Sequence, residues 1–224
     1  MSLTDTFTDR MLRRPRGRLA RLMWKDMKAH HGIFGDTLAT LALSPDDRLL
    51  EIGCGGGTFA ARALTTGCRV TAVDHSADMV ALTEAANPEA LREGRLQVLE
   101  ADAAALPLPD GHFSCATTMN TLFFTDAATV LAELRRVLEP GGRLVIHTVA
   151  PHPPNKTMPG PVARRLRFHT DDELRALLES AGFQEVRVSR IDGVFQLASA
   201  VRVAGSSTIT SSEAAKHVRD DSHA

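Results

Sequence analysis

Short apolar runs alternate with stretches of helical periodicity through the middle of the chain. The runs are rich in aliphatic or β-branched residues, and several end at glycine or an acidic residue, which is typical of buried strands. The predicted strands are 48–52, 69–73, 96–99, 113–119 and 143–149. The predicted helices between them are 58–65, 76–86 and 126–138. Because strands alternate with helices, the pattern predicts an α/β protein with a parallel sheet that helices cover on both faces.

The pattern changes after the fifth strand. Residues 151–169 are rich in proline, arginine and histidine, which predicts a loop. Thr170 is followed three residues later by Glu173, and this spacing predicts a capping box at the start of a helix. That helix is expected to end at Gly182.

The last structured part of the chain is expected to be a hairpin. Two β-rich runs, 184–191 and 195–203, are separated by Asp192 and Gly193. An Asp-Gly pair between two such runs favours a tight turn, so these strands form an antiparallel edge of the sheet. Residues 205–224 are polar and without periodicity, which predicts a disordered tail.

Composition narrows the class of protein. The 224 residues suffice for one α/β domain, and the net charge of −1 argues against a nucleic-acid binder. No run is long enough to span a membrane and nothing near Met1 resembles a signal peptide, so no integral membrane association is expected. An odd number of cysteines cannot pair fully, and each lies in an apolar or glycine-rich stretch, so we expect reduced thiols in a cytoplasmic protein. There is no C-x-x-C pair, so we expect no metal site. The three cysteines are Cys54, Cys68 and Cys115.

The first thirty residues carry eight basic and three acidic side chains, a local charge of +5. Their apolar residues recur at helical spacing. These are Leu12, Leu19, Leu22, Met23 and Met27. A docked amphipathic helix, an anion-binding segment and a membrane-surface helix all fit this pattern, whereas a cleaved transit peptide would avoid acids. We expect residues 1–45 to form a helical arm, of which 10–30 fold over the active site as a lid, followed by the main domain at 46–204.

A glycine cluster follows the first strand. Gly53, Gly55 and Gly57 form a G-x-G-x-G pattern, whereas the usual dinucleotide fingerprint would need glycine where Thr58 stands. Glycine lets the backbone turn sharply and approach a ligand closely, although a turn without a ligand also fits. Asp74 ends the second strand, where a carboxylate either caps a helix or accepts both hydroxyls of a ribose. The glycine cluster and Asp74 together indicate a nucleoside ligand. They do not distinguish a nicotinamide cofactor from an adenosyl cofactor.

A third acidic segment, 100–103, ends the third strand and is followed by LPLPDG at 106–111. With it, the chain resembles the class I S-adenosylmethionine-dependent methyltransferases, particularly the small-molecule branch that includes the ubiquinone and menaquinone methyltransferases. The matching segments occur in family order over about 45–190. They are LLEIGCGGGT (49–58), VTAVDHSADMV (70–80), VLEADAAALPLPDGHFS (98–114), LRRVLEPGGRLVI (134–146) and FHTDDELRALLESAGFQEV (168–186).

The resemblance implies a Rossmann-like seven-stranded, mostly parallel sheet with one antiparallel strand, and S-adenosylmethionine as cofactor. It also implies roles for single residues. The methionine portion would lie against Glu51, Gly53, Cys54, Gly55 and Gly57. The ribose would bind Asp74, and the adenine would lie near His75, Met79, Asp102 and Ala103. The transferable methyl and the acceptor would lie near Asn120 and Thr121. Ser114 departs from the family, because many relatives have aspartate there.

The reaction expected from the resemblance is methyl transfer to the O, N or C atom of a small molecule. A general base is needed only if the acceptor is protonated. The candidate bases are His147, His31 and His169, with His30 beside them. Cyclisation with the same cofactor, a nicotinamide-dependent oxidoreductase and a non-catalytic binding module remain alternatives. Neither the acceptor nor the oligomeric state follows from the sequence.

Overall fold

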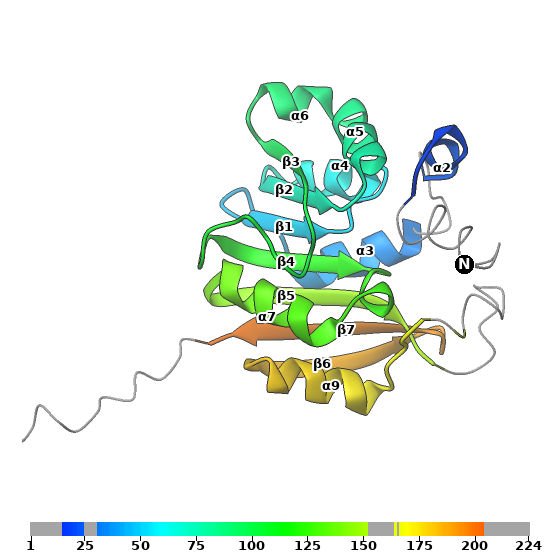
Figure 1. The fold of residues 1–224 in the computed structure, drawn as a ribbon. Coiled ribbons are helices and arrows are strands. Elements are labelled where there is room, and N and C mark those ends of the chain that lie inside the picture. Colours follow the sequence, from blue (N-terminus) through cyan, green and yellow to red (C-terminus); the bar gives the residue numbers. More distant parts are fainter. Residues whose placement is uncertain (1–14, 25–30, 152–163, 165, 204–224) are drawn as a thin grey trace, which may run out of the picture.

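A seven-stranded sheet forms the centre of a computed structural model, which describes residues 15–24, 31–151, 164 and 166–203 (Figure 1). The strand order is β3-β2-β1-β4-β5-β7-β6. β7 pairs antiparallel with both β5 and β6, and the remaining pairs are parallel. The strands are β1 (Arg48–Ile52), β2 (Arg69–Asp74), β3 (Leu96–Glu100), β4 (Phe113–Met119), β5 (Leu138–Val149), β6 (Phe183–Ile191) and β7 (Phe195–Arg202). The predicted sheet, with its antiparallel C-terminal hairpin, is confirmed.

Helices cover both faces of this sheet. Alternate residues of one strand enter different cores, because successive side chains point to opposite faces. Leu50 packs with Leu131 of α7 and Leu174 of α9, whereas Leu49 packs with Phe34 of α3 and Phe59 of α4. The helices are α2 (Arg18–Trp24), α3 (His31–Leu41), α4 (Thr58–Leu64), α5 (Ala77–Ala86), α6 (Pro88–Arg92), η3 (Leu122–Phe124), α7 (Ala127–Val137) and α9 (Asp171–Ser180).

A longer fifth strand and an additional helix distinguish the structure from the sequence prediction. The strand predicted at 143–149 begins at Leu138, directly after α7, so Pro140 and the two glycines lie within β5. Between β4 and β5, Phe113 pairs with Leu138 and Cys115 pairs with Arg143, so the register shifts between these two pairs. This shift accommodates the longer β5 segment. A helix also begins at Pro88, because proline is favoured in the first turn, where its missing N–H is not needed.

Other local predictions are confirmed. Thr170 and Glu173 form the capping box, in which the Glu173 N–H donates to Thr170 Oγ1 at 3.2 Å and the Thr170 N–H to Glu173 Oε2 at 2.7 Å. The predicted disordered tail lies outside the described residues, as do most of residues 1–30.

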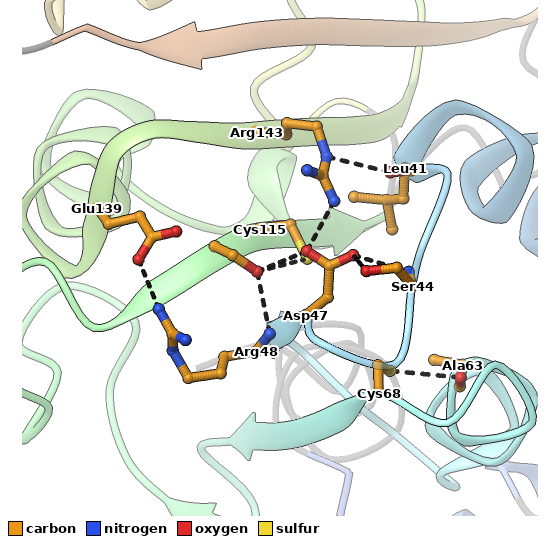
Figure 2. Close-up of polar contacts among 10 residues, drawn as sticks. Leu41, Ser44, Asp47, Arg48, Ala63, Cys68, Cys115, Glu139 and Arg143 are labelled. Carbon is orange, nitrogen blue, oxygen red and sulfur yellow. Dashed lines mark hydrogen bonds and ion pairs between the residues drawn. The ribbon is translucent and has the colours of Figure 1, made fainter.

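A buried carboxylate joins the starting ends of the strands (Figure 2). Asp47 is 6% exposed, and its Oδ1 accepts hydrogen bonds from Ser114 Oγ at 2.6 Å and Arg143 Nη2 at 2.9 Å. Its Oδ2 accepts from the Ser44 N–H at 2.8 Å. Arg143 Nε also donates to the Leu41 carbonyl at the end of α3. The cluster therefore connects α3, β1, β4 and β5 at the edge opposite the strand ends that carry the predicted site.

These bonds determine the charge state of Asp47. Burial alone would raise the pKa of this carboxyl, but the hydrogen bonds from Ser114, Ser44 and Arg143 outweigh burial, and the pKa is lowered. Asp47 is therefore ionised at neutral pH and stabilises the fold in that form.

Candidate active site

The glycine cluster forms the loop between β1 and α4. Gly53 and Gly57 both have φ of 77°, a region that residues with a side chain rarely adopt. A Cβ on Gly53 would overlap the Thr121 hydroxyl, and one on Gly57 would lie 2.8 Å from the Thr83 Cα. The loop therefore requires glycine for its conformation and for its close approach to neighbouring segments.

Asp74 is the polar centre of this region. Its carboxylate is 7% exposed, and its Oδ2 accepts a hydrogen bond from the Gly55 N–H at 3.1 Å. Its Oδ1 accepts from the Ser76 N–H at 3.0 Å, at the start of α5. His75 Nδ1 lies 3.5 Å from the same oxygen. Asp74 thus binds the backbone of the glycine loop and that of Ser76, the residue just before α5.

Two cavities meet at Asp74. The first has a volume of about 80 Å³ and the second about 550 Å³. The residues that line the first include Glu51, Gly53, Cys54, Gly55, Asp74, His75, Met79, Asn120 and Thr121. The residues that line the second include Gly53, Asp74, His75, Asp102, Ala103 and Thr121. The structure therefore brings together every predicted cofactor-binding residue except Gly57, which lines neither cavity.

Aromatic side chains that the sequence analysis did not single out complete the first cavity. Trp24, Phe34 and Phe124 line it together with Met119. Trp24 is the single tryptophan of the chain and lies in the basic arm. No other feature of the sequence indicated its place in the cavity. The other aromatic residues of this wall, Phe34, Phe59 and Phe124, come from α3, α4 and η3, and only the fold brings them together.

Two acidic groups in the first cavity have raised pKa values. Glu51 is buried and its Oε2 has no hydrogen-bond partner among the described residues. Burial raises the pKa of the Glu51 carboxyl well above its usual value, and the nearby charge of Asp74 adds to the effect. Burial also raises the pKa of the Cys54 thiol. Both shifts favour the uncharged form of the group, and an uncharged Cys54 thiol is not a nucleophile.

The two candidate bases whose side chains the structure describes, His147 and His169, line neither cavity. His147 is buried within β5, with its ring 5.2 Å from that of Phe195, and it lines neither cavity. His169 lies just before α9, also outside both linings, and burial lowers the pKa of its imidazole. His31 is the first residue of α3, but its side chain lies outside the described part, as does all of His30. A catalytic role for any of them stays a prediction.

The arm lies against the first cavity. Figure 1 shows α2 beside α5, at the edge where the parallel strands end. The Gly17 N–H donates to Asp78 Oδ2 at 2.5 Å, and Arg21 donates through Nε and Nη2 to Asp78 Oδ1 at 2.9 and 2.6 Å. Ser76 Oγ donates to the Pro15 carbonyl at 2.5 Å. Pro15 and Trp24 themselves line the cavity, so the arm contributes part of its wall.

The described residues contain neither a metal-binding cluster nor a membrane-spanning helix. No group of three or more histidine, cysteine, aspartate or glutamate residues within that part of the chain is placed to hold a metal ion. No helix in the same part is long and apolar enough to cross a membrane.

Comparison with known proteins identifies the domain. Residues 50–146 match a family model described as a methyltransferase domain, and these residues contain the glycine loop, Asp74, Asp102 and Asn120. This segment belongs to the methyltransferase domain family. The resemblance to class I S-adenosylmethionine-dependent methyltransferases is thereby confirmed. The methyltransferase assignment also disfavours the nicotinamide-dependent alternative.

Curated methyltransferases resemble the chain beyond this segment. It is 31% identical over 166 residues to the O-methyltransferase resE of Aspergillus sclerotiorum, covering 68% of this chain and 61% of that protein. It is 38% identical over 109 residues to a demethylmenaquinone methyltransferase of Thermus thermophilus, covering 47% and 49%. The matches thus span about half to three fifths of these relatives.

A solved structure supports the fold of the methyltransferase domain. The [4+2]-cyclase SpnF superposes with a TM-score of 0.70 over 80% of this chain and 83% of its own, at 21% identity. At this identity the similarity concerns the fold alone.

Proposed function

We propose that this chain binds S-adenosylmethionine and transfers its methyl group to a small-molecule acceptor. One observation carries the proposal. Asp74 ends β2 at the junction of two cavities, and its carboxylate accepts a hydrogen bond from the glycine loop of a methyltransferase domain. A carboxylate at the end of the second strand, beside a loop that needs glycine, suits a ribose with its two hydroxyls.

The second cavity suits the adenosine portion of the cofactor. Its volume of about 550 Å³ lies within the range of small-ligand sites. Asp102 is exposed at its wall, and its Oδ1 accepts from the Ala104 N–H at 2.9 Å. The carboxylate retains lone pairs for an adenine amino group, while His75 and Ala103 border the same space.

The first cavity suits the methionine portion. The unpartnered Oε2 of Glu51 is an observation that fits a ligand with polar groups, because an unpaired buried oxygen is costly. Gly53, Gly55 and Gly56 line the same space with backbone alone. When bound, S-adenosylmethionine supplies an activated methyl group, so the residues of the chain need only align the acceptor and exclude water.

The arm fits the role of a lid. At about 80 Å³ the first cavity is narrow, and ring atom Cε3 of Trp24 would lie 3.2 Å from a Cβ on Gly55. Entry of the cofactor therefore requires the arm to move, and its return excludes water. In this proposal residues 1–45 form the arm and lid, residues 46–204 bind the cofactor, and 205–224 take no part.

The acceptor is proposed to be a small apolar molecule. The matched relatives include one named for demethylmenaquinone and one O-methyltransferase, and the first cavity has aromatic walls. A quinone-type or secondary metabolite agrees with both observations.

Calorimetric titration tests the cofactor. S-Adenosylhomocysteine is expected to bind with micromolar affinity, while NAD produces no saturable heat. The control is Asp172→Ala, which removes an exposed carboxylate that lines neither cavity. Equal binding of NAD, or no binding of S-adenosylhomocysteine, would contradict the proposal.

A further inference from the structure

Helix α2 carries apolar side chains on two faces. On its inner face, Ala20 is fully buried and Trp24, one turn later, lines the first cavity. Leu19, Leu22 and Met23 occur at the i, i+3 and i+4 spacing that places side chains on one face of a helix. At about 100° per residue, this outer face is turned away from the inner one. The inner face therefore packs against the domain, and the outer face does not.

The outer face of α2 exposes large apolar side chains. Leu19 is 67% exposed, Leu22 73% and Met23 38%. Within the part of the chain that the structure describes, these three are the exposed large hydrophobic residues. Figure 1 shows α2 at the margin of the domain, beside α5. Hydrophobic residues scattered singly over a surface need no explanation, but residues gathered on one helix face form a patch of the kind that marks an interface.

Positive charge accompanies this apolar face. Arg18 is exposed and lies one turn before Leu22, at the border of the outer face. The first thirty residues carry +5, and because the whole chain carries −1, the rest carries −6. An anionic surface therefore attracts the arm and repels the remainder of the chain, which orients the chain with the arm toward that surface.

A lipid surface suits this combination better than a second copy of the chain. In a two-fold symmetric contact through α2, the basic arm of each copy would face that of the other, and like charges oppose such a contact. An anionic bilayer offers both requirements in one place, because its acyl boundary accepts leucine side chains and its phosphates attract arginine.

We propose that the outer face of α2 binds the surface of an anionic lipid bilayer, with its apolar side chains below the headgroups and Arg18 among the phosphates. The inference goes beyond the proposed function and does not depend on it, because binding to lipid needs neither cofactor nor acceptor. It places the first cavity, which Trp24 lines from the inner face of the same helix, close to the lipid surface. An apolar acceptor dissolved in the bilayer then has a short path to that cavity.

Vesicles of two compositions test the inference with the full chain. One kind contains phosphatidylcholine alone, and the other contains about one third phosphatidylglycerol, which is anionic. Binding is measured by co-sedimentation over a series of lipid concentrations. We expect binding to the anionic vesicles to be at least about tenfold tighter and to weaken at high salt, because salt screens the attraction of exposed basic residues to the surface.

Substitutions on the outer face separate insertion from charge attraction. Leu19→Gln combined with Leu22→Gln removes two apolar side chains but keeps the helix propensity and the net charge. We expect this double variant to bind anionic vesicles at least about tenfold more weakly. Leu19→Met combined with Leu22→Met is the matched control, which keeps the face apolar and should bind within about threefold of wild type. Circular dichroism and melting temperature confirm that each variant is folded.

A charge substitution tests the border of the outer face. Arg18→Gln is expected to bind anionic vesicles about fivefold more weakly, because one basic residue near the surface is lost. Arg92→Gln removes the same charge from an exposed position on α6 and should bind within about twofold of wild type.

Several results would overturn the inference. These are the absence of binding to either kind of vesicle, equal binding to both kinds, an unchanged affinity in the double glutamine variant, and equal losses in Arg18→Gln and Arg92→Gln. Analytical ultracentrifugation identifies the competing occupant, since a dimer that the double glutamine variant dissociates would assign the outer face to a second copy instead. A failure of wild type to bind S-adenosylhomocysteine would contradict the proposed function and leave vesicle binding unchanged.

Discussion

The hydroxyl of Ser114 donates to Asp47 Oδ1 at 2.6 Å and accepts from the Arg48 N–H at 3.0 Å. Ser114 stands where many methyltransferases of this type have aspartate. A carboxylate at this position would place a second negative charge beside Asp47. A neutral hydroxyl that donates to Asp47 therefore suits this position in the cluster.

Asp47→Asn is expected to lower the free energy of unfolding by about 2–3 kcal/mol at pH 7, because a hydrogen-bonded buried charge is lost. The folded-state pKa of Asp47 is lowered, so its contribution is complete above the unfolded value of about 3.9 and declines as the pH falls through the folded value. Urea unfolding at pH 7 and at pH 3.5 measures this. The control, Asp46→Asn, changes an exposed neighbour. An Asp47 effect that does not shrink in acid would contradict the assignment.

Asp74→Ala is expected to weaken binding of S-adenosylmethionine by about 1.5–3 kcal/mol, because charge-assisted hydrogen bonds to the ribose are lost. Asp74 also accepts from the Gly55 and Ser76 N–H groups, so part of the loss comes from a looser loop. Asp74→Asn retains one oxygen acceptor and should lie between wild type and alanine. Titration of the three proteins separates the contributions. An unchanged affinity of folded Asp74→Ala for S-adenosylmethionine would contradict the assignment of Asp74 to the ribose.

Gly55→Val is expected to abolish cofactor binding while the circular dichroism stays largely native. The new side chain would meet Trp24 at 3.2 Å and stand beside the first cavity. Gly94→Val is the matched control. Gly94 also has a positive φ, of 68°, but nothing lies within 4 Å of its Cβ position, so this variant bears similar backbone strain away from the site. Normal cofactor binding by Gly55→Val would show that the loop is only a structural turn.

The three cysteines are expected to be unreactive in the folded protein. All are buried, and burial raises the pKa of each thiol, that of Cys115 to about 12. Because the thiolate is the reactive form, a thiol-specific reagent at pH 8 should label none of them until denaturant is added. Rapid labelling of one native cysteine, located by mass spectrometry, would show that its segment opens readily.

Most of the fold could be predicted from the sequence, because strand and helix periodicities and the Asp192-Gly193 turn are local signals. It missed the start of β5 at Leu138, because a Pro-Gly-Gly segment normally ends an element and is accommodated here by a register shift between strands. It also identified the residues at the strand ends around Asp74. Phe34, Met119 and Phe124 were missed, since their common cavity depends on packing between distant segments.

Asp78 holds the arm against the first cavity. Asp78→Ala should release residues 15–24, because it removes the acceptor for Gly17 and Arg21. The hydrogen bond from the Gly17 N–H, together with Arg21, lowers the pKa of Asp78, so the contact persists at neutral pH. Trp24 fluorescence should shift to the red in the variant. Glu93→Gln is the control, since it removes a comparable exposed ion pair, with Arg95, outside both cavities.

Function distinguishes a lid from a helix that is merely docked. If the arm closes over the cofactor, Asp78→Ala should release S-adenosylhomocysteine faster in stopped-flow experiments. S-Adenosylhomocysteine should also slow cleavage by trypsin near Arg13–Arg21 in wild type, because an ordered lid hides its backbone. Deletion of residues 1–30 should leave a folded domain with some cofactor affinity and no turnover, since water then reaches the reacting centre. Normal turnover by the truncated protein, or a cleavage rate that ignores the ligand, would mean that α2 is docked beside the site without closing it.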